Sequence, residues 1–308
     1  MSSRGFVKMT EAKRPLSVGV LVLNYNTWDL ALRALNTAIL LESEMIEEYV
    51  LFDDGSPMPP PAGIDHRVRV IRGGVNRGYT SALKIAFAEM KSDLVVLFDA
   101  DARPLAPFGL RVRERFEGDK RLGQLAFFAE DENGLPTQSF LSGEPTKWSL
   151  LLGQKLYAWI PCKAPRPSDL CVFSCCMATR REAYIQVGEI DENFDFLDAD
   201  LDYSMRLRRS GWRVAADPSL KAFHTGGAWR QPQRHRVLRF YKSRWYLLRK
   251  HKVITNVRVA RFIILVRLRL EQMILKLFGT FMFRTPEVLA EKILGRFELI
   301  TYCREHYR

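Results

Sequence analysis

The 308-residue sequence has no run of uncharged apolar residues as long as the roughly 20 that a helix needs to cross a bilayer. Its first fifteen residues, MSSRGFVKMTEAKRP, contain no apolar core and so lack the pattern of a secretory signal. Low-complexity tracts and internal repeats are also missing. We therefore expect a cytoplasmic protein without a spanning helix, in which residues 1–15 form a flexible N-terminus.

Cysteine is scarce and odd in number, with five residues in all, and Cys175 and Cys176 are adjacent within the apolar run 170–178. Buried, reduced thiols are the expected state, which fits a reducing compartment. A zinc site is the alternative interpretation, but the spacing C-x8-C-x3-C-C matches no common zinc pattern.

Negative charge is almost absent from one end of the chain. From Arg230 onward there are 19 Lys and Arg against 5 Asp and Glu, a balance of +14, whereas residues 1–229 carry 28 against 30, a balance of −2. The basic character thus belongs to the tail, which indicates an anionic partner for the tail and a different role for the body.

The first hundred residues alternate between apolar runs and segments with helical spacing, which predicts strand–helix–strand units. Fully apolar strands of this kind indicate a parallel sheet with both faces covered. The expected strands are 17–25, 48–56, 67–71 and 94–99, and the expected helices are 28–42, with Thr27 as its N-cap, and 78–91.

Farther on, a helix near 104–118, a strand near 123–130 and a helix over 146–160 are expected. They are followed by a strand over 170–178, a helix capped by Thr179, and a helix that starts near Asp200 and ends at Gly211. Within that last helix we expect Leu201 to face the core and Arg206, Arg208 and Arg209 to be solvated. A strand over 212–216 completes the body.

Polar side chains gather where the early strands end. Asn24 and Asn26 follow the first strand, Asp53 and Asp54 the second, and Asp99 and Asp101 the strand 94–99. Asp and Asn are common in turns everywhere, so one such end carries little weight. Ligands of parallel sheets bind beyond the carboxyl ends of the strands, and three such ends together predict a binding crevice.

A second acidic group, Asp198, Asp200 and Asp202, crowds the start of the later helix, and His224 follows. Helix capping would explain one carboxylate but not three. Mg²⁺ and Mn²⁺ prefer oxygen ligands and bind carboxylates together with substrate phosphates. The two groups therefore predict divalent-metal chemistry.

These residues resemble a family 2 glycosyltransferase with the GT-A nucleotide-sugar fold, in its rhamnosyltransferase-like branch. The matching segments are 20-VLVLNYNTWDLALRAL-35, 52-FDDGS-56, 73-GGVNRGYTSALKIAF-87 with 97-LFDAD-101, and 176-CMATRREAYIQVGEIDENFDFLDADLDYSMRLRRSGWRV-214 with 222-AFHTGG-227. The resemblance implies a mostly parallel central sheet flanked by helices in a catalytic domain over 16–230, followed by a basic amphipathic helical region over 231–308.

The resemblance also implies roles for individual residues. Asn24 and Asn26 would line the nucleotide cleft, Asp53 would bind the base with Arg77 near it, and Asp99 would face the ribose. Asp101 and His224 would hold Mn²⁺ or Mg²⁺.

Asp200 would be the catalytic base that takes a proton from an acceptor hydroxyl, with Asp202 as the second acid. The family's glutamate position is Ala199 here, and Asp198 comes one residue earlier. The family motif can therefore be aligned in two registers that differ by one residue, and the assignment of the base depends on the register.

The implied reaction is a metal-dependent, inverting sugar transfer from a UDP- or dTDP-sugar, rhamnose included, to a lipid-linked or polymeric glycan. The alternatives are a nucleotide-sugar-binding protein without transferase activity, a nucleotidyltransferase, and a basic nucleic-acid-binding protein. The charged tail suggests nucleic acid, but it gives no reason for the acids at the sheet edge. A nucleotidyltransferase would carry a Gly-rich phosphate loop after the first strand, and residues 24–28, NYNTW, are not one. We therefore expect no nucleic-acid partner.

In the tail, the segment 232–251 resembles the helix that follows the catalytic domain in many such transferases, and a second helix is expected over 257–283. The second mixes large apolar residues with Arg258, Arg261, Arg267, Arg269 and Lys276. Such a helix suits an anionic membrane surface, on which the protein would be peripheral. Packing on the catalytic domain, or on a second copy in a homo-oligomer, explains the pattern equally well.

Overall fold

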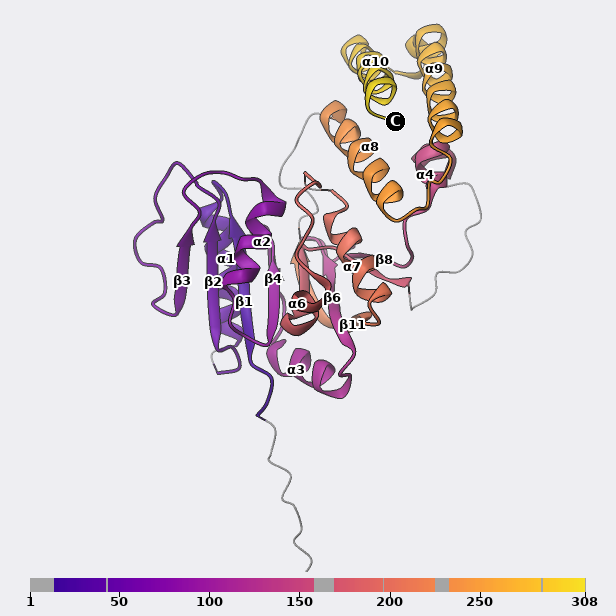
Figure 1. Cartoon of the computed structure of the whole chain (residues 1–308). Helices are drawn as coiled ribbons and strands as arrows, with labels where there is room; N and C mark the ends of the chain where they lie inside the picture. The colour runs from indigo at the N-terminus through magenta and orange to yellow at the C-terminus, as the bar shows by residue number, and fades with distance from the viewer. Residues whose placement is uncertain are drawn as a thin grey trace, which may run out of the picture.

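The computed structural model describes residues 14–42, 44–157, 169–195, 197–224, 233–283 and 285–307. A central sheet with helices on both faces forms the body, and three long helices near the C-terminus lie together at one end of it (Figure 1). Most of the predicted flexible N-terminus, part of the predicted helix 146–160 and the boundary at 230/231 lie outside the described residues.

The strands of the first hundred residues form the parallel part of the sheet, as predicted. β1 pairs with β2 on one side and β4 on the other, and β2 pairs with β3, all parallel. Every residue of β1 is buried, because the sheet is covered on both faces. The bounds are β1 Val18–Asn24, β2 Glu48–Asp53, β3 Val68–Arg72 and β4 Leu94–Phe98.

The second half of the sheet is mixed, with the order β3-β2-β1-β4-β10-β6-β11-β5 and β7 beside β6. β10 lies antiparallel between β4 and β6, while β11 runs parallel to β6 and antiparallel to β5. The bounds are β5 Ala102–Pro104, β6 Leu122–Glu130, β7 Pro136–Thr137, β10 Cys176–Arg180 and β11 Arg213–His224.

Two predicted strands differ from the structure. The apolar run 170–178 is divided by a turn into β9, Cys171–Val172, which pairs with β8, Phe140–Leu141, in a separate small sheet, and β10. Thr179 lies inside β10 rather than capping a helix. The strand predicted at 212–216 continues through an irregularity at 217–221 as far as His224.

Helices cover the two faces of the sheet and form two cores. α1 and α3 pack on one face through residues such as Leu35 and Phe116, and α2, α6 and α7 pack on the other through Phe87, Tyr184 and Leu207. The bounds are α1 Trp28–Leu41, α2 Tyr79–Glu89, α3 Gly109–Gly118, α4 Lys147–Leu151, α5 Gln154–Tyr157, α6 Arg181–Val187 and α7 Ala199–Arg209.

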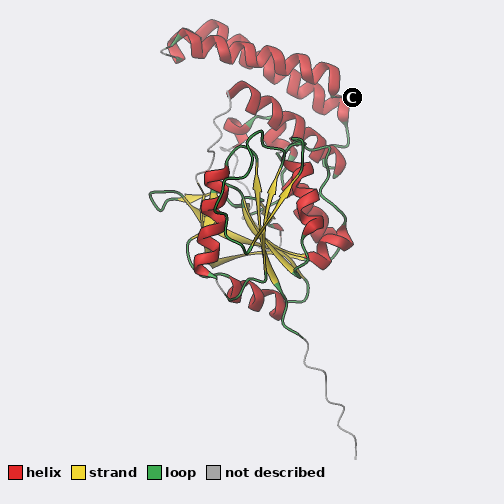
Figure 2. Ribbon diagram, turned by 90° about the vertical axis from the view of Figure 1, so that its left-hand side faces the viewer, coloured by secondary structure: helices red, strands yellow, loops and turns green. Residues whose placement is uncertain are grey.

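The C-terminal helices have a core of their own. α8 (Gln233–Lys250), α9 (Val257–Met282) and α10 (Pro286–His306) bury apolar side chains against one another and against Leu150 and Leu151 of α4. In Figure 2 they form a layer beyond the sheet. Among the residues described, none of the helices has the length and apolarity required to cross a bilayer.

The turn after β2 requires glycine. Gly55 has a φ of 76°, and a Cβ there would lie 2.4 Å from the carbonyl carbon of Val75. Gly63 has a similar φ of 82°, but a Cβ there would meet nothing within 4 Å. Gly55 therefore has both a left-handed backbone and a close approach to Val75, whereas Gly63 has a left-handed backbone alone.

Gly55→Ala is expected to lower the melting temperature more than Gly63→Ala does. Both substitutions carry the cost of a left-handed alanine, about 1–2 kcal/mol, but only Gly55→Ala also pushes the loop at Val75 away. Thermal unfolding followed by circular dichroism measures the difference. Equal shifts for the two variants would show that the contact with Val75 does not constrain the turn.

Candidate active site

The predicted crevice residues lie at one edge of the sheet. Asn24 at the end of β1 pairs in register with Asp53 at the end of β2, and Asp99 directly follows β4 on the other side of β1. Since these strands are parallel and adjacent, their carboxyl ends meet at the same edge.

Asp53 is fully buried and its carboxylate is engaged within the chain. It accepts hydrogen bonds from the Asn24 side-chain amide at 2.7 Å, from the Ser56 hydroxyl, and from Arg72 Nε at 3.1 Å. Arg72, which the sequence analysis did not single out, lies opposite Asp53 in the β2–β3 register. Asp53 thus fixes the turn beside the crevice, and its contact with a base stays a prediction.

Asn26 and Arg77 are exposed at the rim of the same edge. Asn26 adopts a left-handed φ of 57°, and its backbone N–H donates to the Ser56 hydroxyl at 2.8 Å. The buried carboxylate of Asp54 accepts the backbone N–H groups of Arg77 at 3.0 Å and Gly78 at 2.9 Å. Asp54 therefore holds the loop that presents the Arg77 side chain.

Asp99, Asp101 and His224 come together although more than 120 residues separate the last from the first two. The antiparallel pairing of β5 with β11 places Ala102 opposite His224, which brings the histidine to the loop after β4. One ligand atom from each of the three side chains lies within 4.8 Å of the others, and His224 Nε2 is 3.7 Å from Asp101 Oδ1. Two carboxylates and an imidazole form a donor set that suits Mn²⁺.

The surroundings of Asp99 and His224 shift the pKa values of these two groups. Burial raises the pKa of Asp99 to about 6, although the Tyr79 hydroxyl donates to Asp99 Oδ1 at 2.7 Å and opposes the shift. Burial lowers the pKa of His224, but neighbouring Cys175 and the carboxylates of Asp101 and Asp99 outweigh burial and raise that pKa to about 9. Tyr79 was missed by sequence reasoning, because a tyrosine at a helix start carries no distinctive pattern.

Asp200 faces the same crevice from the first turn of α7 and lines a narrow recess together with Tyr79 and Ser174. Its carboxylate accepts the backbone N–H of Ser174 at 3.2 Å and of Leu201 at 2.8 Å. Burial, followed by the negative charge of Asp198, raises the pKa of Asp200 to about 7. Tyr79 therefore lies between Asp99 and the Asp200 side of the crevice.

The neighbours of Asp200 make different contacts. Asp198 has a left-handed φ of 66° and makes no capping hydrogen bond, but accepts two hydrogen bonds from Arg244 of α8 at 2.8 and 2.9 Å. Asp202 is fully buried, pairs with Arg206 and Lys250 at 2.8 Å, and lies 2.8 Å from His251 Nε2. Of the three acids, only Asp200 lines the recess.

Arg206 and Arg208 of α7 are not simply solvated, contrary to the prediction, whereas Arg209 is exposed as predicted. Arg206 pairs with buried Asp202, and Arg208 pairs with Glu144 and donates to the carbonyl of Leu170. The reason is that segments distant in sequence place acids and carbonyls along this side of the helix, which helical spacing alone does not reveal.

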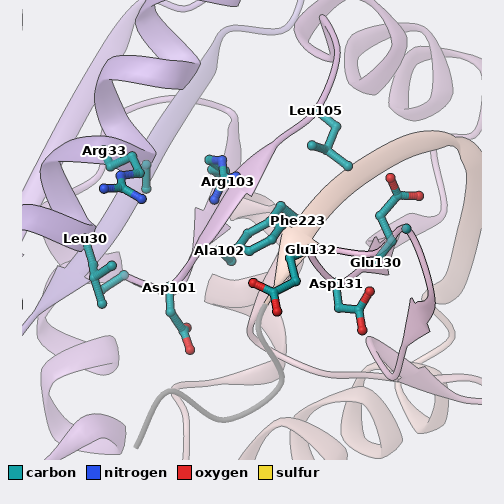
Figure 3. A pocket seen from close by; sticks show the side chains of 13 residues that line it. Leu30, Arg33, Asp101, Ala102, Arg103, Leu105, Glu130, Asp131, Glu132 and Phe223 are labelled. Atoms are coloured by element: carbon teal, nitrogen blue, oxygen red, sulfur yellow. The ribbon is translucent and has the colours of Figure 1, made fainter.

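A second opening reaches Asp101 from the side of α1. This pocket has a volume of about 550 Å³ and lies between α1, β5 and the turn after β6 (Figure 3). Its lining combines two arginines with several acids, so it suits a polar ligand rather than an apolar one. The charged lining residues are Arg33, Arg103, Asp101, Glu130, Asp131 and Glu132.

Comparison with known proteins gives a family and a fold. The model of a family described as Glycosyl transferase family 2 matches residues 19–188. No curated protein matches the sequence.

Among solved structures, the mannosyltransferase PcManGT from Pyrobaculum calidifontis, in complex with GDP-Man and Mn²⁺, is similar with a TM-score of 0.58 and 14% identity, over 94% of this chain and 88% of that chain. GalNAc-T7 with UDP, GalNAc and Mn²⁺ is similar with a TM-score of 0.50 and 15% identity, over 76% of this chain. This chain spans only half of the length of the GalNAc-T7 structure. The predicted GT-A fold is confirmed.

Asp101→Asn is expected to weaken Mn²⁺ binding by more than about tenfold, because it removes a charged oxygen donor from the group of three. Calorimetry with Mn²⁺ in the presence of UDP measures the change. Asp131→Asn is the matched control, since Asp131 lines the adjacent pocket outside the group. Equal affinities for wild type and Asp101→Asn would contradict the assignment.

Arg244→Met is expected to destabilise the fold by about 3–5 kcal/mol, because it leaves the buried Asp198 carboxylate without its cation. Adding Asp198→Asn should recover much of this loss. Arg239→Met is the control and should cost less than about 1 kcal/mol, since its partner Asp195 is 67% exposed. Denaturant unfolding measures all four proteins, and no recovery in the double variant would refute the pairing argument.

Proposed function

The chain belongs to glycosyl transferase family 2, and from this premise we propose that it transfers a sugar from a UDP- or dTDP-sugar to an acceptor hydroxyl with inversion. The proposal includes rhamnose as the sugar, as in the rhamnosyltransferase-like branch. The observation that carries it is the convergence of the Asp99–Asp101–His224 group and Asp200 on one crevice, with Tyr79 between them.

On the donor side, we assign the nucleotide to the edge formed by the ends of β1, β2 and β4. Asn24 and Asp53 hold the shape of the turn, and Asn26 and Arg77 are exposed at its rim, where a base and ribose would reach them. Asp99 follows β4 and faces the ribose in this arrangement. The support is geometric, since parallel strands offer their ligand sites at this edge.

The Asp99–Asp101–His224 group is the part of the crevice that we assign to the diphosphate of the nucleotide-sugar donor. Asp101 and His224 would hold Mn²⁺ or Mg²⁺, with Asp99 beside them; the carboxylate oxygens suit either ion, and the imidazole nitrogen favours Mn²⁺. When bound, the ion stabilises the negative charge that develops on the leaving nucleoside diphosphate.

On the acceptor side, Asp200 is the proposed general base. A carboxylate with a pKa of about 7 is better matched to accepting a proton near neutral pH than one with an ordinary pKa. Asp202, the second predicted acid, would act through its ion pairs by holding α7 in place. One available carboxylate supports a single displacement, in which the acceptor attacks from the face opposite the leaving group.

For the acceptor we propose a glycan hydroxyl on a lipid-linked or polymeric substrate. The basic C-terminal helices support the lipid-linked form, because they would bring the crevice to the cytoplasmic face of an anionic membrane. Donor hydrolysis tests the transferase proposal without knowledge of the acceptor. Release of UDP or dTDP from a panel of nucleotide-sugars, dependent on Mn²⁺ or Mg²⁺, is the expected result. Donor binding without any turnover would instead identify a nucleotide-sugar-binding protein.

Asp200→Asn is expected to reduce kcat by about 10²–10⁴-fold, the usual contribution of a general base, while donor affinity measured by calorimetry stays near that of wild type. In the wild type, kcat should fall as the pH drops below about 7, because the base becomes protonated. Turnover of Asp200→Asn near the wild-type rate would exclude Asp200 as the base.

Protein stability provides the control for that variant. A carboxyl whose folded pKa exceeds its unfolded value favours folding below the unfolded pKa, and this benefit is lost as the pH rises through about 7. Asparagine does not ionise, so the Asp200→Asn protein should be more stable than wild type at pH 8 and should lose this advantage as the pH falls toward 4. A less stable variant would point to misfolding as the cause of lost activity.

A further inference from the structure

Helix α9 is apolar on two opposite faces, and only one of them is covered. On the inner face, Ala260, Ile264, Leu268 and Leu275 are at most 8% exposed. They belong to the core that α9 shares with α8, α10 and α4. The structure thus accounts for one of the two apolar faces by packing within the chain.

The opposite face carries a continuous row of large apolar side chains in contact with solvent. The steps from Val259 to Val266, Leu270, Leu277 and Phe281 are seven, four, seven and four residues, so these residues lie along one side of the helix. With 26 residues, α9 is about 39 Å long. We call this row the outer stripe, and its members are Val259, Phe262, Val266, Leu270, Met273, Ile274, Leu277 and Phe281, with exposed fractions from 39% to 90%.

Helix α9 lies at the margin of the molecule. α9 and α10 lie in the layer farthest from the sheet, so a flat surface can approach this layer without meeting the body (Figures 1 and 2). On the body, large exposed apolar residues such as Leu110 and Ile185 come from separate elements, α3 and α6. Concentration along one helix marks an interaction surface rather than ordinary surface composition.

The charges next to the outer stripe are positive. Arg258, Arg269 and Lys276 are exposed and follow one another along one flank of the stripe, at steps of eleven and seven residues. The single acid of α9, Glu271, is occupied by Arg267 and Arg296. The exposed side of α9 therefore offers apolar groups and cations together.

We propose that the outer stripe of α9, with its flank of Arg258, Arg269 and Lys276, docks on an anionic lipid bilayer, with the helix parallel to the membrane plane. The stripe enters the headgroup boundary and the flank contacts lipid phosphates. The outer stripe is thus the contact face for the anionic membrane that the proposed function includes. Lipid docking can be tested without a sugar donor or an acceptor. Failure to dock would therefore leave the transferase proposal untouched.

Charge favours lipid over a second copy of the chain as the occupant. Two outer stripes packed together would bring two basic flanks into one interface without an acid from α9 to offset them. Anionic headgroups supply the missing negative charge, and each basic residue near such a surface strengthens binding by roughly fivefold. The wider segment from Arg230 onward has a charge balance of +14, which also favours an anionic surface.

The test is co-sedimentation of the full chain with phosphatidylcholine vesicles, with and without phosphatidylglycerol. Wild type should bind the anionic vesicles, and more weakly at high salt. Leu270→Gln/Leu277→Gln should bind at least about tenfold more weakly, because it removes apolar contact without changing charge or helix propensity strongly. The matched control Leu110→Gln/Ile185→Gln alters equally exposed residues of the body and should bind as wild type does.

A second pair of variants isolates the charge. Arg269→Gln/Lys276→Gln should weaken binding to anionic vesicles by roughly 30-fold, from fivefold for each residue, and should reduce its salt dependence. Lys120→Gln/Arg121→Gln, two exposed cations of the body, should leave binding unchanged. All variants should keep the melting temperature and oligomeric state of wild type.

Three results would overturn the proposal. The first is absence of wild-type binding to anionic vesicles, and the second is wild-type binding by Leu270→Gln/Leu277→Gln. The third is a wild-type dimer, detected by light scattering, that this variant converts to a monomer. That result would assign the outer stripe to an interface between copies of the chain.

Discussion

The cost of removing carboxylates from water at one edge of the sheet is the constraint on which the rest of the structure depends. Most acids there are compensated: Asp53 by Arg72, Asp198 by Arg244, and Asp202 by Arg206 and Lys250, with His251 as a further hydrogen-bond partner. Asp99 and Asp200 are instead left with raised pKa values in the crevice. A carboxylate kept under these conditions is poised to bind a cation or to accept a proton, and both are requirements of the proposed reaction.

The compensation couples the C-terminal helices to the crevice. The family match ends at residue 188, yet Asp200 lies beyond it, and α8 supplies Arg244, Lys250 and the adjoining His251 to the acids on either side of Asp200. α9 in turn packs its inner face on α8. A contact made by the outer stripe is therefore only two helices away from the proposed base. This arrangement places the proposed membrane contact and the proposed base on one continuous set of packed elements.

Sequence reasoning found the strand ends because continuous apolar runs followed by acids are local patterns. Asn24, Asp53, Asp99 and Asp101 were placed correctly at one edge for this reason. It left the register of the base open between Asp198 and Asp200, and only Arg244 of α8, which pairs with Asp198, distinguishes the two. Tyr79, Arg72 and Arg244 were missed because their meaning depends on the partner across the fold. The packing interpretation of the tail is seen in the core that α8, α9 and α10 share, and the lipid interpretation stays a prediction for the second apolar face of α9.

By itself the sequence determined the alternation of strands and helices in the first hundred residues, the acidic strand ends and the basic, amphipathic tail, because periodicity and local composition specify these. Only the tertiary structure decided that β10 runs antiparallel, that β5 and β11 carry His224 to Asp101, and which acids are neutralised. These depend on pairing and desolvation between segments far apart in the chain. The energy of such contacts depends on the folded arrangement, and local sequence patterns carry no information about it.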